Sequence, residues 1–218
     1  WKYETLNAPF DFPIHKTVEE LKEEVEHIRR EQPPIFVFNA NVLPGQLKQL
    51  NERVNRFRTG KNEAQINQFV EKFKEIYEKG IILMPTQLSE KEVKSVLIIR
   101  DNIAREEKME DVYTLKKAYS TLTDFVNSLA LGKSTKENLT GVNLNDMLKS
   151  NLDYDASRTE AAIENSVKKI SPTQGMVRQG EQIIANGELV TAEKYKLLNS
   201  FRIEHEQDLG STSDKVKI

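Results

Sequence analysis

The chain of 218 residues contains no cysteine, no long apolar run and no strong net charge. Without cysteine there are no disulfides, no thiolate catalysis and no cysteine-based zinc site. The longest apolar runs, such as Ile35–Phe38, have four residues, whereas a membrane-spanning helix needs about 20. The 32 basic and 34 acidic residues nearly cancel to −2, so no field draws in nucleic acid.

Catalytic patterns are also missing. The histidines, His15, His27 and His205, lie far apart, and none precedes an aspartate. The chain therefore lacks the adjacent His-Asp pair with which HD-type hydrolases hold two metal ions. No G-x-S-x-G motif or Ser/His/Asp arrangement occurs. We expect no catalytic residues, no metal site and no cofactor, and the ligand-binding residues are unknown from the sequence.

Three polar patterns have a structural reading beside a functional one. Gly132–Thr135 resembles the end of a phosphate loop, but Asn127 stands where that loop needs glycine, so we interpret the stretch as a helix end and a loop. Asp153 and Asp155 could bind a cation, although a turn or capping role is expected. Arg100-Asp101-Asn102 follows an apolar run, where a turn is the default and a ligand site at a strand end is the alternative.

Apolar residues recur with helical spacing in six segments, several of which begin with a capping residue. The first predicted helix is capped by Thr17 and Glu20 and ends before Pro33-Pro34, the second contains Leu47 and Val54, and the third runs from Ile66 to Tyr77 with Gly80 as its C-cap. The fourth begins at Thr114 and ends at Gly132. The fifth is capped by Ser157 and Glu160 and reaches Ile170, and the sixth is capped by Thr191. Ser89 and Glu92 offer a further capping box. The middle aromatic residues Phe57, Phe69, Phe73 and Tyr77 are expected in a core rather than an interface.

Short apolar runs and turn signals predict the strands and loops. Strands are predicted at Ile35–Phe38, Ile81–Met84, Val96–Ile99 and Leu152–Tyr154. Asn186-Gly187 predicts a hairpin that pairs Ile184 with Leu189 and Ile183 with Val190. Residues 133–151 are expected to be loop, with at most a helical turn near Asn145–Lys149, and residues 206–218 a mobile tail.

An internal similarity suggests the domain organisation. Shifting the chain by 142 positions aligns Phe10-Asp11-Phe12 with Leu152-Asp153-Tyr154, and aligns the helices that follow. We therefore predict that strands near Phe12 and Tyr154 share one sheet. The expected fold is α+β and helix-rich, with a small sheet from the N- and C-terminal segments and a mostly helical central insertion. Residues 1–205 form one domain in this interpretation, in which 1–40 and 150–205 make one substructure and 41–150 the middle.

The ends of the chain carry a family resemblance. Leu6-Asn7-Ala8-Pro9-Phe10-Asp11-Phe12-Pro13-Ile14, followed by Lys16-Thr17, resembles the segment after the first membrane helix in Bacteroidetes-type seven-transmembrane HD proteins. The stretch from Val177 to Thr191 resembles that family's V-x-x-G-E-x-I-x-x-x-G-E-x-V-T motif, which precedes the second membrane helix. Asp111-Val112-Tyr113-Thr114 is also similar to the family.

The resemblance implies a non-catalytic sensory domain on the periplasmic face of the inner membrane, tethered to membrane helices at both ends. It also implies a separate cytoplasmic HD phosphohydrolase, whose relatives hydrolyse cyclic di-AMP and none of whose catalytic residues lies in this chain. The expected partner is a ligand or an envelope protein of unknown identity. The alternative is an envelope scaffold or dimerisation domain without a small ligand, which forms a homodimer or docks another envelope protein.

Overall fold

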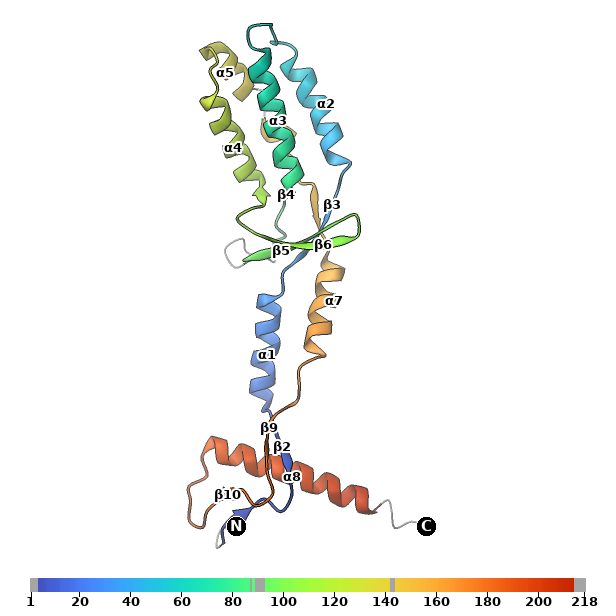
Figure 1. The fold of residues 1–218 in the computed structure, drawn as a ribbon, viewed down its shortest axis with the longest axis vertical. Coiled ribbons are helices and arrows are strands. Elements are labelled where there is room, and N and C mark those ends of the chain that lie inside the picture. The colour runs from blue at the N-terminus through green and yellow to red at the C-terminus, as the bar shows by residue number, and fades with distance from the viewer. Residues whose placement is uncertain (1–3, 87, 89–92, 142–143, 214–218) are drawn as a thin grey trace. The chain divides into compact units, whose positions relative to one another are not determined.

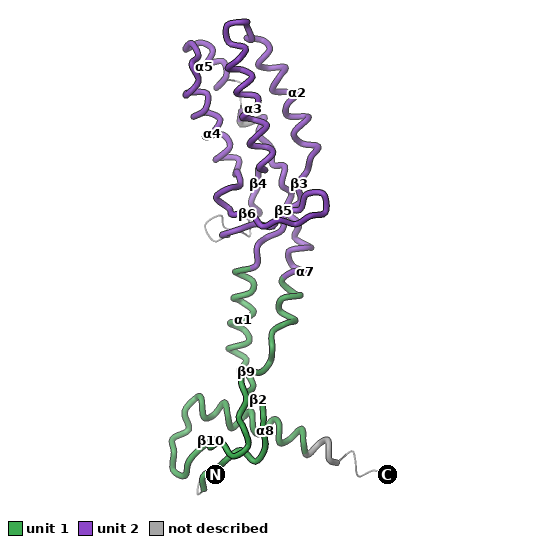
Figure 2. The backbone as a smooth tube through the Cα atoms, viewed as in Figure 1, with its two compact units in different colours: residues 1–31, 163–218 green, residues 32–162 purple. Residues whose placement is uncertain are grey.

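The computed structural model describes residues 4–86, 88, 93–141 and 144–213 (Figure 1). The chain divides into two compact units (Figure 2). Unit 1 comprises residues 1–31 and 163–218, and unit 2 comprises residues 32–162. The first and last segments thus belong to one unit, with boundaries at 31 and 163 where the sequence suggested 40 and 150.

Unit 1 is built by pairing N-terminal strands with C-terminal strands. Its elements are β1 (Leu6–Asn7), β2 (Phe12–His15), α1 (Val18–Glu31), β9 (Thr173–Val177), β10 (Gln182–Ile184) and α8 (Ala192–Ser213). Strand β1 pairs antiparallel with β10, and β2 pairs antiparallel with β9. Helix α7 (Ala156–Val167) begins in unit 2 and ends in unit 1.

An aromatic core joins α8 to the strands of unit 1. The fully buried ring of Phe12 lies 5.7 Å from the ring of Phe201 on α8 and 6.2 Å from that of Phe10. Val177 and Ile183 complete the buried centre, and Leu197 and Leu198 pack against it. Burying such side chains stabilises the unit by about 1.5–3 kcal/mol each.

Unit 2 contains a six-stranded mixed sheet and a set of helices. Its elements are β3 (Ile35–Phe38), α2 (Val42–Val54), α3 (Glu63–Lys79), β4 (Ile81–Ile82), β5 (Ser95–Arg100), β6 (Ile103–Lys108), β7 (Tyr113–Thr114), α4 (Leu115–Ser128), α5 (Lys133–Thr140), α6 (Leu144–Met147) and β8 (Leu152–Tyr154). The strand order is β6-β5-β3-β8-β4-β7. Strand β3 runs parallel to β5 and antiparallel to β8. The α+β fold class is confirmed.

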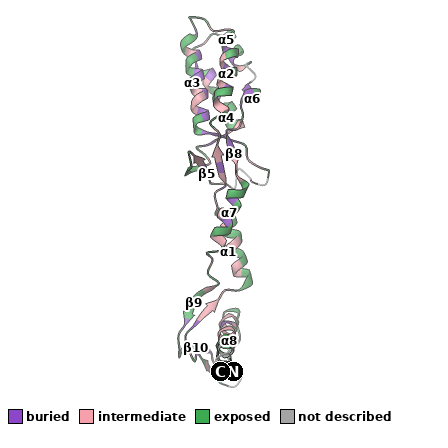
Figure 3. Ribbon diagram, turned by 90° about the vertical axis from the view of Figure 1, so that its right-hand side faces the viewer, coloured by how far each residue is buried: buried purple, intermediate pink, exposed green. Residues whose placement is uncertain are grey.

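Buried side chains of unit 2 form a helical core and a sheet core, and Figure 3 shows the burial of each residue. Phe69, Phe73 and Tyr77 on α3 are fully buried among the helices, as the spacing predicted, while Phe57 is partly buried. Phe36 and Leu152 lie in the sheet core. The Thr17–Glu20 capping box of α1 is confirmed, because each side chain accepts a hydrogen bond from the other residue's backbone N–H, at 3.2 and 2.8 Å.

The prediction of a loop over residues 133–151 was wrong. Gly132 is the N-cap of α5 and does not end a helix, since its carbonyl accepts from the backbone of Thr135 and Lys136. Leu139 and Met147 are fully buried against α2, α3 and α4. Few apolar residues occur here, so no helical stripe is visible, and the helices are held by packing on the preceding bundle.

The predicted hairpin at Asn186-Gly187 was also wrong. Only Gly187 has positive φ, at 75°, whereas a type I′ turn needs positive φ at both residues. Ile184 pairs with Leu6 of β1, and Leu189 is 81% exposed. The N-terminal strand β1 thus pairs with β10, whereas the local turn signal had predicted that residues 189–190 would do so.

Strands near Phe12 and Tyr154 do not share a sheet, so that prediction was wrong. In the part of the chain that the structure describes, β2 pairs with β9 in a two-stranded sheet of unit 1, whereas β8 lies in the six-stranded sheet of unit 2. The similarity of the two segments therefore reflects amphipathic patterning rather than a shared substructure.

The remaining differences concern element ends. Asp155, not Ser157, caps α7, because its Oδ1 accepts from the backbone N–H of Arg158 at 2.9 Å, and this helix ends at Val167 rather than Ile170. Helix α8 runs to Ser213 where a tail was expected from residue 206. The capping box predicted at Ser89 and Glu92 lies outside the described residues.

Candidate functional site

The β5–β6 hairpin presents a continuous face of alternating residues. Asp101 and Asn102 form its two-residue turn with φ of 49° and 62°, the left-handed values that a type I′ turn requires. Aspartate and asparagine accept these values more easily than most residues. Because side chains alternate along a strand, the register puts one set on a common face, namely Ile98 and Arg100 of β5 with Ile103, Arg105 and Glu107 of β6.

This hairpin face borders a cleft in unit 2. The cleft has a volume of about 510 Å³, which lies in the range of small-ligand sites. Besides these five side chains and Asp101 of the hairpin turn, it is lined by Glu78 and Lys79 at the end of α3 and by Asp111 and Val112 before β7. The floor contains apolar Ile98 and Val112, and charged groups surround it.

Arg100 is the most constrained charged group of the cleft. Its guanidinium stacks on the ring of Phe38, with 3.9 Å from Cζ to the ring centroid, and donates to the carbonyl of Lys79 at 3.0 Å. Burial is the main cause that lowers the pKa of Arg100, yet arginine starts so high that it stays charged. The stacking and the single backbone bond hold the planar group in one orientation.

The cleft combines charges of both signs. Within the described residues, neither Arg100 nor Arg105 has a carboxylate at ion-pair distance. The carboxylates of Glu78, Glu107 and Asp111 also line the cleft. A guanidinium with unused donors suits a carboxylate, which it binds with two parallel hydrogen bonds. The arrangement can bind a small polar molecule, and it offers no nucleophile beside a base.

The turn predicted at Arg100-Asp101-Asn102 is confirmed. The cleft lies at the same strand end, where a ligand site was the alternative prediction. Strand β6 was missed because all six of its residues are exposed and no apolar alternation marks it. Of the aspartates considered for a cation, Asp155 caps α7, and Asp153 accepts from the side-chain amide of Asn39 at 3.2 Å. Among the described residues, no group of three or more metal-ligating side chains occurs.

The histidines lie apart from this cleft. In unit 1, His15 contacts Glu204 at 2.6 Å, and the ring of His205 lies 5.7 Å from that of Phe201. His27 is exposed on α1.

A polar clamp holds α8 to the N-terminal segment of unit 1. Lys196 Nζ contacts both carboxylate oxygens of Glu20, at 2.5 and 2.6 Å. The hydrogen bond from Lys196 is the largest cause that lowers the pKa of Glu20, followed by the backbone bond from Thr17. Farther along α8, buried Ser200 accepts from the backbone N–H of His15 at 2.9 Å. Three successive turns of α8 are therefore tied to β2 and the start of α1, counting the His15–Glu204 contact.

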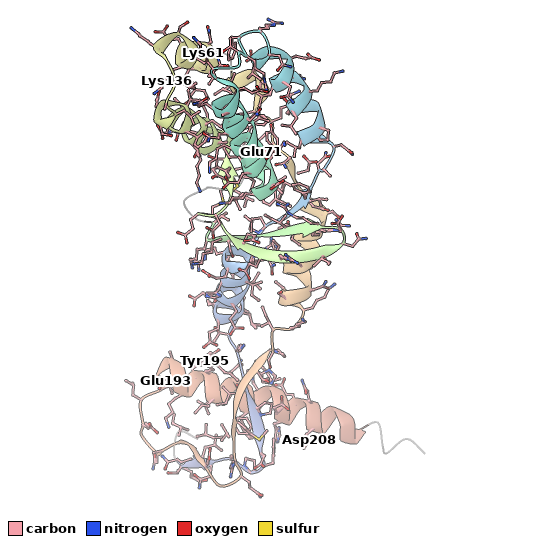
Figure 4. The ribbon with its side chains drawn as sticks, turned by 45° about the horizontal axis from the view of Figure 1, so that its top comes forward. Lys61, Glu71, Lys136, Glu193, Tyr195 and Asp208 are labelled. Carbon is pink, nitrogen blue, oxygen red and sulfur yellow. The ribbon has the colours of Figure 1, made fainter. Side chains whose placement is uncertain are left out.

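Unit 1 also carries an exposed apolar surface near the start of α8. A groove of about 550 Å³ is lined by Leu6, Val190, Tyr195, Leu198 and Phe201, with Asn199 and Arg202. Tyr195 is 66% exposed on the first turns of the helix (Figure 4). Neighbouring large apolar groups that remain exposed mark an interaction surface more often than a stable free surface.

The comparison with protein families decides the classification. The profile of the family described as 7TM-HD extracellular matches residues 3–204. The chain belongs to this family. The match spans both units, and it includes the N-terminal segment and the Val177–Thr191 stretch that carried the resemblance.

As a 7TM-HD extracellular domain, the chain lies outside the cytoplasm. Among its described helices, none is both long and apolar enough to cross a membrane. No curated protein and no solved structure matches the chain.

Proposed function

We propose that this 7TM-HD extracellular domain is a non-catalytic sensor that binds a small polar ligand in the cleft of unit 2. The full-length protein would be tethered by membrane helices on both sides of the domain and would face the periplasm. Its separate cytoplasmic HD domain would hydrolyse cyclic di-AMP, and the ligand would bias that activity. A ligand can do so only if the conformations of the protein bind it with different affinities.

The observation that carries this proposal is the arrangement of Arg100. Its guanidinium is held between Phe38 and the end of α3, and it has no carboxylate partner in the described part of the chain. Buried or half-buried arginine is normally paired, so an unpaired one at a cleft favours an anionic group on a ligand. The nearby carboxylates of Glu78 and Glu107 favour a second, cationic group on the same ligand. Amino acids, short peptides and cell-wall peptides have this chemistry.

Thermal unfolding with a panel of amino acids, dipeptides and cell-wall peptides tests the proposal. A ligand at one hundred times its Kd stabilises the folded state by about 2.7 kcal/mol. For a chain of this size, each kcal/mol raises Tm by about 2–4 °C. The rise should disappear in Arg100→Met, which keeps the apolar stem over Phe38 but lacks the charge.

The matched control is Arg56→Met, an exposed arginine in unit 2 that does not line the cleft. It should respond to the same ligand as the parent chain. If no compound of the panel raises Tm, or if Arg100→Met responds as strongly as the parent, the cleft is not the sensing site.

The alternative is an envelope scaffold without a small ligand, and the exposed apolar groove of unit 1 favours it. In that case another envelope protein would cover Leu6, Val190 and Tyr195. The ligand panel would then leave Tm unchanged for the parent chain and for both arginine variants.

A further inference from the structure

Strand β6 is an exposed edge of the six-stranded sheet. It pairs along its whole length with β5, and nothing in the described part of the chain pairs with its other side. All six residues, Ile103–Lys108, are exposed, and the strand contains neither proline nor a bulge. Such an edge is a template for another strand, unless its side chains prevent pairing.

The hairpin register identifies the free hydrogen-bonding groups. Arg100 and Ile103 close the two-residue turn, so they form a hydrogen-bonded pair. Hydrogen-bonded and non-hydrogen-bonded pairs alternate along an antiparallel ladder. The backbone groups of Arg105 and Glu107 therefore point toward β5, whereas those of Ala104, Glu106 and Lys108 point outward.

The charges on β6 are complementary to those of a second, antiparallel β6. Arg105 and Glu107 share the cleft face of the hairpin and are separated by one residue of the opposite face. If a second β6 pairs antiparallel with Glu106 opposite Glu106, each Arg105 lies opposite Glu107 of the other copy. Opposite charges in facing positions stabilise a strand pair, and like charges destabilise it.

We propose that this chain forms a two-fold symmetric dimer through antiparallel pairing of β6 with β6 of a second copy, centred on Glu106. In this register the outward-pointing groups of Ala104, Glu106 and Lys108 form the new ladder. On the opposite face, the two Glu106 side chains meet at the axis, which is a destabilising like-charge contact, and Lys108 of the other copy is a diagonal neighbour of each that offsets it in part. The cleft of each copy then gains charged groups of the second copy at its rim.

Neighbouring registers differ in their facing charges. A shift of two residues in one direction places Arg105 opposite Arg105 and loses both Arg105–Glu107 pairs. The same shift in the other direction places Glu107 opposite Glu107 and replaces those pairs by Glu106–Lys108 pairs. A shift of one residue would pair side chains of opposite faces, which a two-fold axis perpendicular to the sheet does not allow. The charges therefore disfavour the register centred on Arg105, and cross-linking at Glu106 distinguishes the registers centred on Glu106 and on Glu107.

This inference specifies the homodimer alternative and does not rest on ligand binding. A six-residue strand buries less surface than a stable dimer needs, so the dimer is weak in dilute solution. Tethering two copies to one membrane raises their effective concentration and favours the pair. A test must therefore capture a weak contact.

Disulfide cross-linking tests the register, because the chain contains no cysteine. Glu106→Cys would place two cysteines in facing positions, with Cα atoms about 5.5 Å apart, which a disulfide can bridge. Mild oxidation should give at least tenfold more covalent dimer than Glu52→Cys, an exposed control on α2. Ala104→Cys mixed with Lys108→Cys should give a mixed dimer, since these positions face each other.

Charge exchange tests the complementarity. In the Glu106→Cys chain, Arg105→Glu alone or Glu107→Arg alone should reduce cross-linking severalfold, and the two changes together should restore it. A mixture of the two single-exchange chains should cross-link with each other. The proposal is overturned if Glu106→Cys cross-links no better than the α2 control, or if the charge exchanges at Arg105 and Glu107 leave the yield of cross-linked dimer unchanged. The thermal response of the unmodified chain to ligands reports on the sensing function separately.

Discussion

The junction between α3 and β4 depends on two residues. Gly80 has φ of 106°, a value that residues with a Cβ rarely adopt, and it allows the chain to leave α3 directly into β4. The buried side chain of Asn151 completes the junction, because its Oδ1 accepts from the N–H of Ile81 and its amide donates to the carbonyl of Tyr77, both at 2.7 Å. The helical core and the sheet core of unit 2 meet at these bonds.

Gly80→Ala should destabilise the protein by about 2–4 kcal/mol, from backbone strain together with overpacking. An added Cβ would lie 2.6 Å from Cδ1 of Leu152, so the side chain of a buried residue must move. Urea unfolding should show a lower midpoint. Gly60→Ala is the control, because nothing lies within 4 Å of its added Cβ, and its stability should change by less than about 0.5 kcal/mol. Equal effects at the two glycines would contradict the assignment.

At the scale of elements, α8 is attached to unit 1 by two kinds of contact. Phe201 and its apolar neighbours pack on β2, while Lys196 reaches Glu20 at the start of α1. The apolar contacts do not respond to pH. The Glu20 carboxylate does, because the hydrogen bond from Lys196 and that from Thr17 favour its charged form.

The stability of unit 1 should decrease in acid through Glu20. Its folded pKa lies below the ordinary value of 4.5, so the clamp contributes fully above that value and is lost as pH falls through the lower folded pKa. Glu20→Gln keeps a side chain that can complete the capping box but removes the charge. We expect the variant to have a lower Tm than the parent at pH 7, and the difference to shrink as pH falls through the folded pKa of Glu20.

Glu19→Gln, at the preceding exposed position of α1, is the matched control. It should leave the difference between pH 7 and pH 3 as in the parent chain. A Tm gap between Glu20→Gln and the parent that persists unchanged into acid would mean that the clamp charge does not stabilise the unit.

At the scale of the molecule, each unit has its own hydrophobic core. Unit 2 is continuous in sequence, while unit 1 is assembled from both ends of the chain. Near the boundary of unit 2, the backbone N–H of Ile35 donates to the hydroxyl of Thr159 at 3.0 Å, and the N–H of Asp155 donates to the carbonyl of Ile35 at 2.9 Å. The two ends of unit 2 are thus tied to each other inside that unit.

A fragment of residues 32–167, which keeps α7 whole, should therefore fold by itself. Circular dichroism should show helix and a cooperative thermal transition, because both cores of unit 2 are retained. A fragment of residues 1–31 alone is the contrasting case, since its strands lack β9 and β10, and it should be unfolded. A disordered 32–167 fragment would show that unit 2 requires unit 1.

Several features of the fold were predictable because they depend on neighbours in sequence. Thr17, Thr114 and Thr191 cap helices through bonds that reach three residues along the chain. The strand at Ile35–Phe38 follows from an uninterrupted apolar run. The cleft could be predicted only in part, because the turn at Asp101-Asn102 was predicted but the exposed strand β6 that follows it was not.

By itself the sequence determined the α+β class and most of the long helices, because helix caps and apolar periodicity act over a few residues. The tertiary structure alone decided which strands pair, that β10 joins β1 rather than residues 189–190, and that α5 is buried. It also decided that Arg100 meets Phe38 and the end of α3. These pairings and contacts depend on competition between segments far apart in the chain. Short-range sequence patterns do not indicate which distant segment forms the more stable contact.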